Sequence, residues 1–172
     1  VSSSTGEVAV LDSRLASKWS FRATERRATI GALAIDPVKQ DLAVGMADRV
    51  SPTAFDDAVT MWDAHTQVPR FSVGGEREDI PGCANFYSRI RFSCDATRVA
   101  ITSHDYSVLV VESSTGEVRS QMPGSTTILD VDFSPDDTLL VGTYDNGLVN
   151  VWNTSDFSLA ASYQGAPGEY YA

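Results

Sequence analysis

The sequence predicts an all-β protein built from repeated four-stranded antiparallel sheets. Three observations support this prediction: short runs alternate apolar and polar residues, turn residues separate the runs, and the pattern recurs along the chain. Corresponding runs end at Leu11, Trp62, Val111 and Trp152, at intervals of 51, 49 and 41 residues. Alternation with a period of two is typical of a half-buried strand, and a repeat of this length is typical of stacked supersecondary units.

The clearest unit covers residues 128–163. Ser134-Pro135-Asp136-Asp137 predicts a turn, because Pro presets φ and Asp side chains bind the nearby backbone. Asp145-Asn146-Gly147 predicts a tight hairpin, because Asn and Gly tolerate positive φ. The four strands are expected at 128–133, 139–144, 148–152 and 158–163. A meander this short cannot bury both of its faces, so we expect it to stack on the other units.

Three earlier units show the same pattern. Residues 1–24 form half a unit, so the chain opens inside one, and complete units are expected at 29–73 and 87–122. The expected strands are 8–12 and 18–23 in the half unit, 30–35, 42–46, 58–62 and 70–73 in the second unit, and 88–93, 99–103, 108–112 and 118–121 in the third. The repeats form one expected domain, residues 1–165, followed by a C-terminal tail of residues 166–172.

The ends of the third strands carry a recognisable pattern. Trp62-Asp63 and Trp152-Asn153 end two of them, and the turn residues Asp56 and Asp105 each lie six residues before the end of one. Together with Ser134-Pro135-Asp136, this pattern resembles the WD-repeat family of β-propellers over nearly the whole chain. The resemblance implies a propeller of four-stranded blades that acts as a rigid platform for other proteins.

The chain also departs from that family. The Gly-His pair of the family is missing before every first strand of this chain. The His-centred hydrogen-bond network of the family is therefore expected to be missing too. Two of the four third strands end without Trp. Quinoprotein-like and seven-residue-motif propellers are therefore alternatives. A β-sandwich of unrelated hairpins is a weaker alternative, because sandwiches do not repeat at this length.

Composition and charge exclude several classes of function. With 172 residues, 42% hydrophobic and 21% charged, the chain has the composition of an ordinary globular domain. Its formal net charge of −10 repels phosphate backbones, so nucleic acid is not an expected partner. No run approaches the ~18 apolar residues of a membrane span, so no membrane insertion is expected. We expect an intracellular, cytoplasmic protein with Cys83 and Cys94 as free thiols, although a disulfide between them is an alternative.

The sequence does not predict an enzyme. His65 and His104 lack a Cys or carboxylate at ligand spacing, so we expect no metal site. No nucleophile elbow or glycine-rich phosphate loop occurs, and no cofactor is expected. We interpret Asp136-Asp137 and Asp56-Asp57 as turn-capping and solvated charges rather than acid–base pairs. A Ser-His-Asp triad assembled in space is an open alternative, as is a propeller-type hydrolase or cofactor-dependent oxidoreductase.

Two insertions interrupt the repeat. The link between the second and third strands of unit 29–73 lengthens to residues 47–57, and the link to the next unit lengthens to 74–86. The chain alternates direction in a meander, so both links should emerge on one face and meet. The predicted partner-binding patch contains Asp48, Arg49, Phe55, Glu76, Arg77, Glu78, Asp79 and Phe86. Mixed charge around aromatic residues is typical of protein-binding sites, whereas inert insertions are the alternative.

These observations predict a non-catalytic scaffold for protein–protein interactions, which is the propeller portion of a larger protein or multi-subunit assembly. A purely architectural subunit is an alternative, because fold does not determine function. Closed propellers have about 4 to 8 blades, and this chain supplies about three and a half. We therefore expect sequence before Val1, or another chain, to supply the rest of the ring. An open stack that docks its bare faces on partner proteins is the alternative.

Overall fold

A computed structural model describes residues 6–11, 14, 17–23, 29–51, 54–78, 89–103 and 106–165 of the chain. All regular secondary structure in these residues is β-strand, as the sequence predicts. The strands form four antiparallel sheets, which we number blades 1 to 4 in chain order. No helix in the described part of the chain is long and apolar enough to cross a membrane.

In the residues that the structure describes, blade 1 has two strands and each later blade has four. Blade 1 contains β1 (Glu7–Leu11) and β2 (Ser17–Arg22). Blade 2 contains β3 (Thr29–Ile35), β4 (Leu42–Ser51), β5 (Ala54–Trp62) and β6 (Pro69–Glu78). Blade 3 contains β7 (Ile90–Phe92), β8 (Arg98–Thr102), β9 (Val108–Glu112) and β10 (Val118–Met122). Blade 4 contains β11 (Ile128–Phe133), β12 (Leu139–Tyr144), β13 (Leu148–Asn153) and β14 (Leu159–Gln164).

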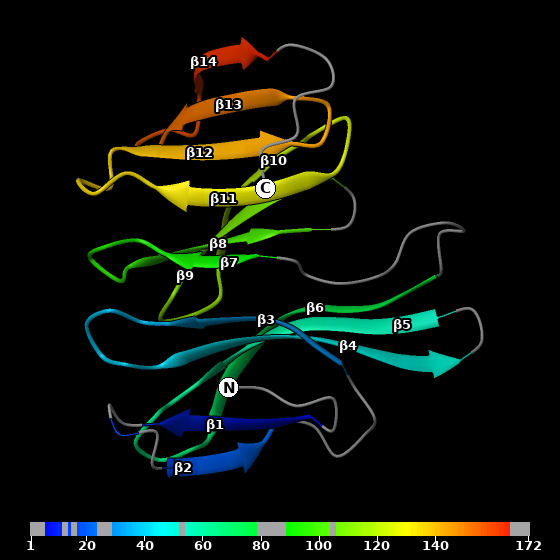
Figure 1. The fold of residues 1–172 in the computed structure, drawn as a ribbon, viewed down its shortest axis with the longest axis vertical. Coiled ribbons are helices and arrows are strands. Elements are labelled where there is room, and N and C mark those ends of the chain that lie inside the picture. The colour runs from blue at the N-terminus through cyan, green and yellow to red at the C-terminus, as the bar shows by residue number, and fades with distance from the viewer. Residues whose placement is uncertain are drawn as a thin grey trace.

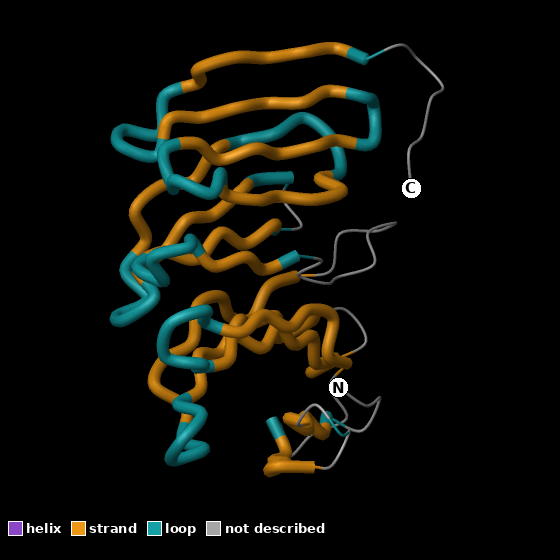
Figure 2. The backbone as a smooth tube through the Cα atoms, turned by 60° about the vertical axis from the view of Figure 1, so that its left-hand side comes forward, coloured by secondary structure: helices purple, strands orange, loops and turns teal. Residues whose placement is uncertain are grey.

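The blades stack in chain order along the long axis of the molecule (Figure 1). In blades 2 to 4 the strands pair in chain order, so each blade is a meander with its first and fourth strands at opposite edges. The first strands join the stack, because β3 contacts β7 and β7 contacts β11. The turned view shows the same succession of sheets as an open stack (Figure 2).

A hydrophobic cluster fills each space between neighbouring blades. Between blades 1 and 2 the buried residues are Val8, Ala23, Leu42, Val44 and Trp62. Between blades 2 and 3 they are Ala43, Val59, Met61, Ile90, Val99, Ile101 and Val111. Between blades 3 and 4 they are Ala100, Val108, Val110, Met122, Ile128, Val131, Phe133, Leu140, Tyr144 and Trp152. Successive residues of each strand serve opposite clusters, so the period-two alternation in the sequence determines the packing.

The turn after the first strand has the same hydrogen bonds in blades 3 and 4. Ser93 Oγ donates to Asp95 Oδ1 at 2.6 Å, and Ser134 Oγ donates to Asp136 Oδ1 at the same distance. The Thr two residues after each Asp donates both its backbone N–H and its hydroxyl to the same carboxylate. The prediction that Asp136 caps a turn is therefore confirmed. The hydroxyl of Ser134 is the largest of the influences that lower the pKa of Asp136.

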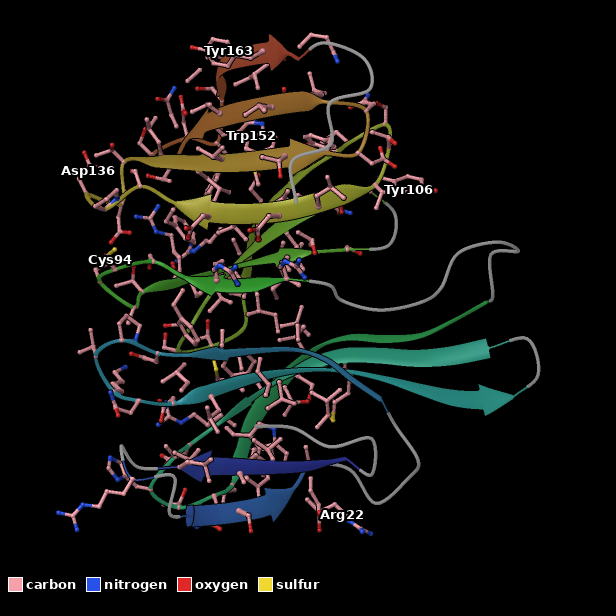
Figure 3. The ribbon with its side chains drawn as sticks, in the orientation of Figure 1. Arg22, Cys94, Tyr106, Asp136, Trp152 and Tyr163 are labelled. Carbon is pink, nitrogen blue, oxygen red and sulfur yellow. The ribbon has the colours of Figure 1, made fainter. Side chains whose placement is uncertain are left out.

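Asp137 connects this turn to the neighbouring blade. Its carboxylate accepts the backbone N–H of Cys94 at 2.7 Å and that of Asp95 at 2.8 Å. The two turns lie on the same side of the stack, where Cys94 and Asp136 are labelled (Figure 3). Ala96 holds the equivalent place in blade 3, with a φ of 58° against 56° at Asp137. Because Ala96 has no carboxylate, blade 3 cannot make the same connection to blade 2.

The structure corrects the sequence prediction in blade 2. Residues 47–57 are not a loop, since β4 continues to Ser51 and β5 begins at Ala54. Asp56 and Asp57 lie in β5, so the interpretation of this pair as turn-capping is wrong. β6 likewise continues to Glu78, into the second expected loop. β5 pairs on both sides, and main-chain hydrogen bonds hold its polar residues in a strand whatever their side-chain pattern.

Candidate functional site

Three strands of blade 2, β4, β5 and β6, continue past the point where β3 ends. β3 pairs with β4 only as far as Thr29 opposite Ala47, whereas β4 pairs with β5 as far as Ser51 opposite Ala54. β5 pairs with β6 to the end of both strands, where Ala54 lies opposite Glu78. We name residues 48–51, 54–56 and 76–78 the blade-2 extension. It projects from one side of the stack (Figure 1).

Six residues of the predicted partner-binding patch lie in the blade-2 extension, where the strands that carry them are paired. Arg49 lies opposite Phe55, and Phe55 lies opposite Arg77. These three residues therefore occupy one row across β4, β5 and β6. The sequence predicted that they meet on two adjoining loops; they lie instead on neighbouring strands of a single sheet.

The adjoining row of the extension is acidic. Asp48 lies opposite Asp56, and Asp56 lies opposite Glu76. Asp56 belongs to this row and not to the tight turn that its sequence position predicts, and only the strand register reveals this. Asp79 and Phe86, the other two predicted partner-binding residues, lie outside the described residues.

Described side chains fix the base of the extension to the rest of the molecule. Phe71 and Val73 of β6 pack against the cluster between blades 2 and 3. The hydroxyls of Thr60 and Ser72 are 2.8 Å apart and link β5 to β6. The ring of Phe71 lies so close to Gly116 of blade 3 that a Cβ there would come within 2.5 Å of it. β6 therefore leaves a well-packed base.

An ion-pair network fixes the start of β6. Arg70 Nη1 lies 2.7 Å from Asp41 Oδ2, and Arg70 Nη2 lies 2.8 Å from Asp63 Oδ2. The Asp41 side chain is only 4% exposed, so solvent screens this pair less than a pair on the open surface. The Arg70 guanidinium holds the pKa of Asp63 well below its usual range. The network ties together the two turns of blade 2 and the strand that leads to the extension.

His65 and Cys94, two of the titratable residues that the sequence singled out, lie in turns of different blades. His65 is exposed in the turn after β5. Cys94 is a free, exposed thiol, and desolvation together with the Asp137 carboxylate raises its pKa, which disfavours the reactive thiolate. Within the described residues, no group of three or more His, Cys, Asp or Glu side chains could hold a metal ion. Cys83 and His104 lie outside those residues.

Two grooves lie between strands of neighbouring blades. The first, about 410 Å³, runs between β3 and β7 and reaches the turns at Pro37 and Cys94. This groove reaches the blade-3 turn in which Ala96 takes the place that Asp137 has in blade 4. The second, about 360 Å³, lies between β1 and β3. Both are lined mainly by apolar side chains of the strands, and neither contains a residue of the predicted partner-binding patch.

The far face of blade 4 carries apolar residues on β12, β13 and β14 beside the polar Asp132 and Thr143, and no described strand covers it. Val149 and Val151 of β13 alternate with the buried Trp152 and are only half-buried. Tyr163 of β14, opposite Val149, is 62% exposed. It lies at the outer end of the stack, whereas Trp152 lies inside blade 4 (Figure 3). This face is named the blade-4 end face and includes Leu139, Val141, Val149, Val151, Ala161 and Tyr163.

Equivalent positions inside the stack show what the blade-4 end face is built for. In blade 3 the residues equivalent to Val149 and Val151 are Val108 and Val110, which are fully buried against blade 4. In blade 2 they are Val59 and Met61, buried against blade 3. The same strand positions therefore carry apolar residues whether or not the described chain covers them.

Comparison with known proteins gives matches of structure alone. No family model and no curated protein matches the sequence. The structure of U3-55K matches with a TM-score of 0.65 and 16% identity, over 83% of this chain and 41% of that chain. The crystal structure of BamB from Moraxella catarrhalis matches with a TM-score of 0.68 and 13% identity, over 95% of this chain and 45% of that chain. The chain thus spans less than half the length of either.

At these identities the likeness shows the fold alone. Both comparisons and the antiparallel four-stranded sheets agree that the chain has a β-propeller-like fold, with an open ring in the described residues. The predicted fold class is therefore confirmed. These comparisons do not show membership of the WD-repeat family.

Proposed function

We propose that this chain is the WD-repeat-like propeller portion of a non-catalytic scaffold for protein–protein interactions, within a larger protein or multi-subunit assembly. The observation that supports this proposal most is the blade-2 extension. Three paired strands leave the stack together there, and they carry six of the residues chosen from sequence as a binding patch.

The composition of the extension suits a protein partner. One row places an aromatic residue between two arginines, and the next row, which belongs to the opposite face of the sheet, is acidic. Tyr, Trp, Phe and Arg are enriched where protein interfaces have their energetic centres, and charged residues are common around them. The packed base of β6, with Phe71 and Val73 in the core, presents these rows on a fixed support. A preorganised surface loses less conformational entropy on binding than a mobile loop.

The proposal includes a cover for the open ends of the stack. The blade-4 end face has the apolar pattern that another blade covers elsewhere in the molecule. Either further sequence of the same protein or another protein chain would supply that cover.

Site-specific cross-linking tests the proposed function. A photoreactive benzoylphenylalanine is placed at position 55 in the protein expressed in its own cells, and adducts are identified by mass spectrometry. The same amino acid at Val38, which is exposed in a turn of the same blade, is the matched control. We expect defined protein adducts from position 55 and none of them from position 38.

The captured partner then allows an affinity measurement. Replacing Phe55 and Phe86 together by Ala should weaken binding about 30-fold, because truncation of buried interface anchors typically costs ~2 kcal/mol or more. The melting temperature should stay within a few degrees of the parent protein. Unchanged affinity in a folded double variant would contradict the role of the patch, and loss of both affinity and stability would show that the two residues are structural.

A further inference from the structure

The fourth strand of blade 2 differs from the other outer strands. β2, β10 and β14 have 6, 5 and 6 residues, whereas β6 has 10. β6 is the last strand of its sheet, so no described strand pairs with its outer side. A long unpaired edge is a template for another strand, and natural proteins usually avoid it with short edge strands. The length of β6 therefore calls for an explanation.

The middle of β6 leaves its backbone accessible. Gly74 and Gly75 follow each other there, and Gly74 has a φ of 110°. Glycine inside a strand weakens it and often marks a place where another backbone approaches closely. Two consecutive glycines remove the side chains that would hinder an approaching strand. They lie where β6 leaves its packed base and enters the blade-2 extension.

Charge limits which segment could pair with this edge. The extension carries the acids Asp48, Asp56, Glu76 and Glu78 against Arg49 and Arg77. Like charges directly opposite each other in a sheet are destabilising, and the register puts three of these acids in one row. A pairing segment with positively charged side chains would relieve the repulsion among these acids. A second copy of this chain would not supply it, since its formal net charge is −10.

We propose that β6 accepts an extended segment rich in Lys or Arg from a partner protein as an additional, fifth strand of blade 2. Main-chain hydrogen bonds supply affinity in this mode of recognition, and side chains at alternate positions supply specificity. The inference rests on the proposed scaffold function and states the chemistry of the partner and the strand that binds it.

Three synthetic peptides of about nine residues test the proposal. The first alternates Lys and Val, the second alternates Glu and Val, and the third is the Lys-Val peptide with alternate backbone nitrogens methylated. The third keeps the charge and removes main-chain donors. We expect the Lys-Val peptide to bind at least about 10-fold more tightly than either of the others. Hydrogen exchange by mass spectrometry should show slower exchange of the amides of residues 70–78 on binding.

A charge-reversed pair of variants makes the test specific. Glu78→Lys should weaken binding of the Lys-Val peptide several-fold, whereas Glu117→Lys, an exposed change of the same charge in blade 3, should not. Equal binding of the methylated peptide, protection at another strand, or no binding would overturn the proposal. If these peptides fail while position 55 still cross-links a partner, strand addition at β6 is wrong and the scaffold function stands. If peptides protect β6 while position 55 captures nothing, strand addition stands and the row around Phe55 is not the partner-binding site.

Discussion

At the scale of single residues, Asp137 shows how one side chain can connect two blades. It has left-handed backbone geometry at the tip of a turn, which Asp tolerates better than most residues. From that position its carboxylate accepts two backbone N–H groups of blade 3. Hydrogen bonds to a charged acceptor are stronger than neutral ones, so this contact supplements the apolar cluster between the same blades.

Replacing Asp137 by Ala should lower the free energy of unfolding by about 1–2 kcal/mol, because two charge-assisted hydrogen bonds are lost at a partly exposed site. Urea denaturation followed by tryptophan fluorescence measures the change. Asp132→Ala is the matched control, because the recorded contact of that carboxylate is with the N–H of the next residue in its own strand. It should cost no more than about 0.5 kcal/mol. Equal losses in the two variants would show that the link between blades contributes nothing.

At the scale of elements, the sequence predicted those strands and turns that depend on local signals. Ser134-Pro135-Asp136 predicted a turn, and its hydrogen bonds are those that Pro and Asp favour. Asn146-Gly147 likewise predicted the hairpin between β12 and β13, where Gly147 has a φ of 80°. Alternation of apolar residues predicted the strands that bury one face against a neighbouring blade.

The blade-2 extension could not be predicted in the same way. Apolar and polar residues do not alternate along residues 48–56, so no periodic pattern marks them as strand. Pairing of β5 on both sides holds them, and pairing is decided by tertiary contacts that a single sequence does not show. The two unusual insertions in the sequence thus predict which residues form the candidate site. The arrangement of these residues in rows follows only from the strand register of the structure.

Shortening the β4–β5 hairpin separates the role of the extension from that of the blade. Residues 48–56 are replaced by Asn-Gly, which favours a tight hairpin between Ala47 and Asp57, already opposite each other. The melting temperature should change by less than about 4 °C, because the new turn closes the hairpin at a pair that already exists and a change of 1 kcal/mol shifts it by about 2–4 °C. Circular dichroism measures this. A shortened protein that no longer melts cooperatively would show that the extension is needed for folding.

At the scale of the whole molecule, the stack is organised around faces that need neighbours. Neighbouring blades cover each other's facing surfaces, and residues of both blades form the cluster in each space between them. The blade-4 end face keeps the same apolar positions with no described strand against it. Each 100 Å² of apolar surface left in water forgoes about 2.5 kcal/mol, which is large beside a typical net stability of about 5–15 kcal/mol. Exposed apolar patches of a few hundred Å² mark interaction sites or aggregation.

The central claim is that this propeller-like chain acts by offering incompletely covered sheets to other proteins. Light scattering coupled to size-exclusion chromatography, on residues 1–172 alone and with a hydrophobic dye present, tests it most directly. We expect association that grows with concentration, or a monomer that binds the dye strongly. Replacement of Val149, Val151 and Tyr163 by Thr, Thr and Ser should reduce either signal. A monodisperse monomer that binds no dye and melts cooperatively would contradict it.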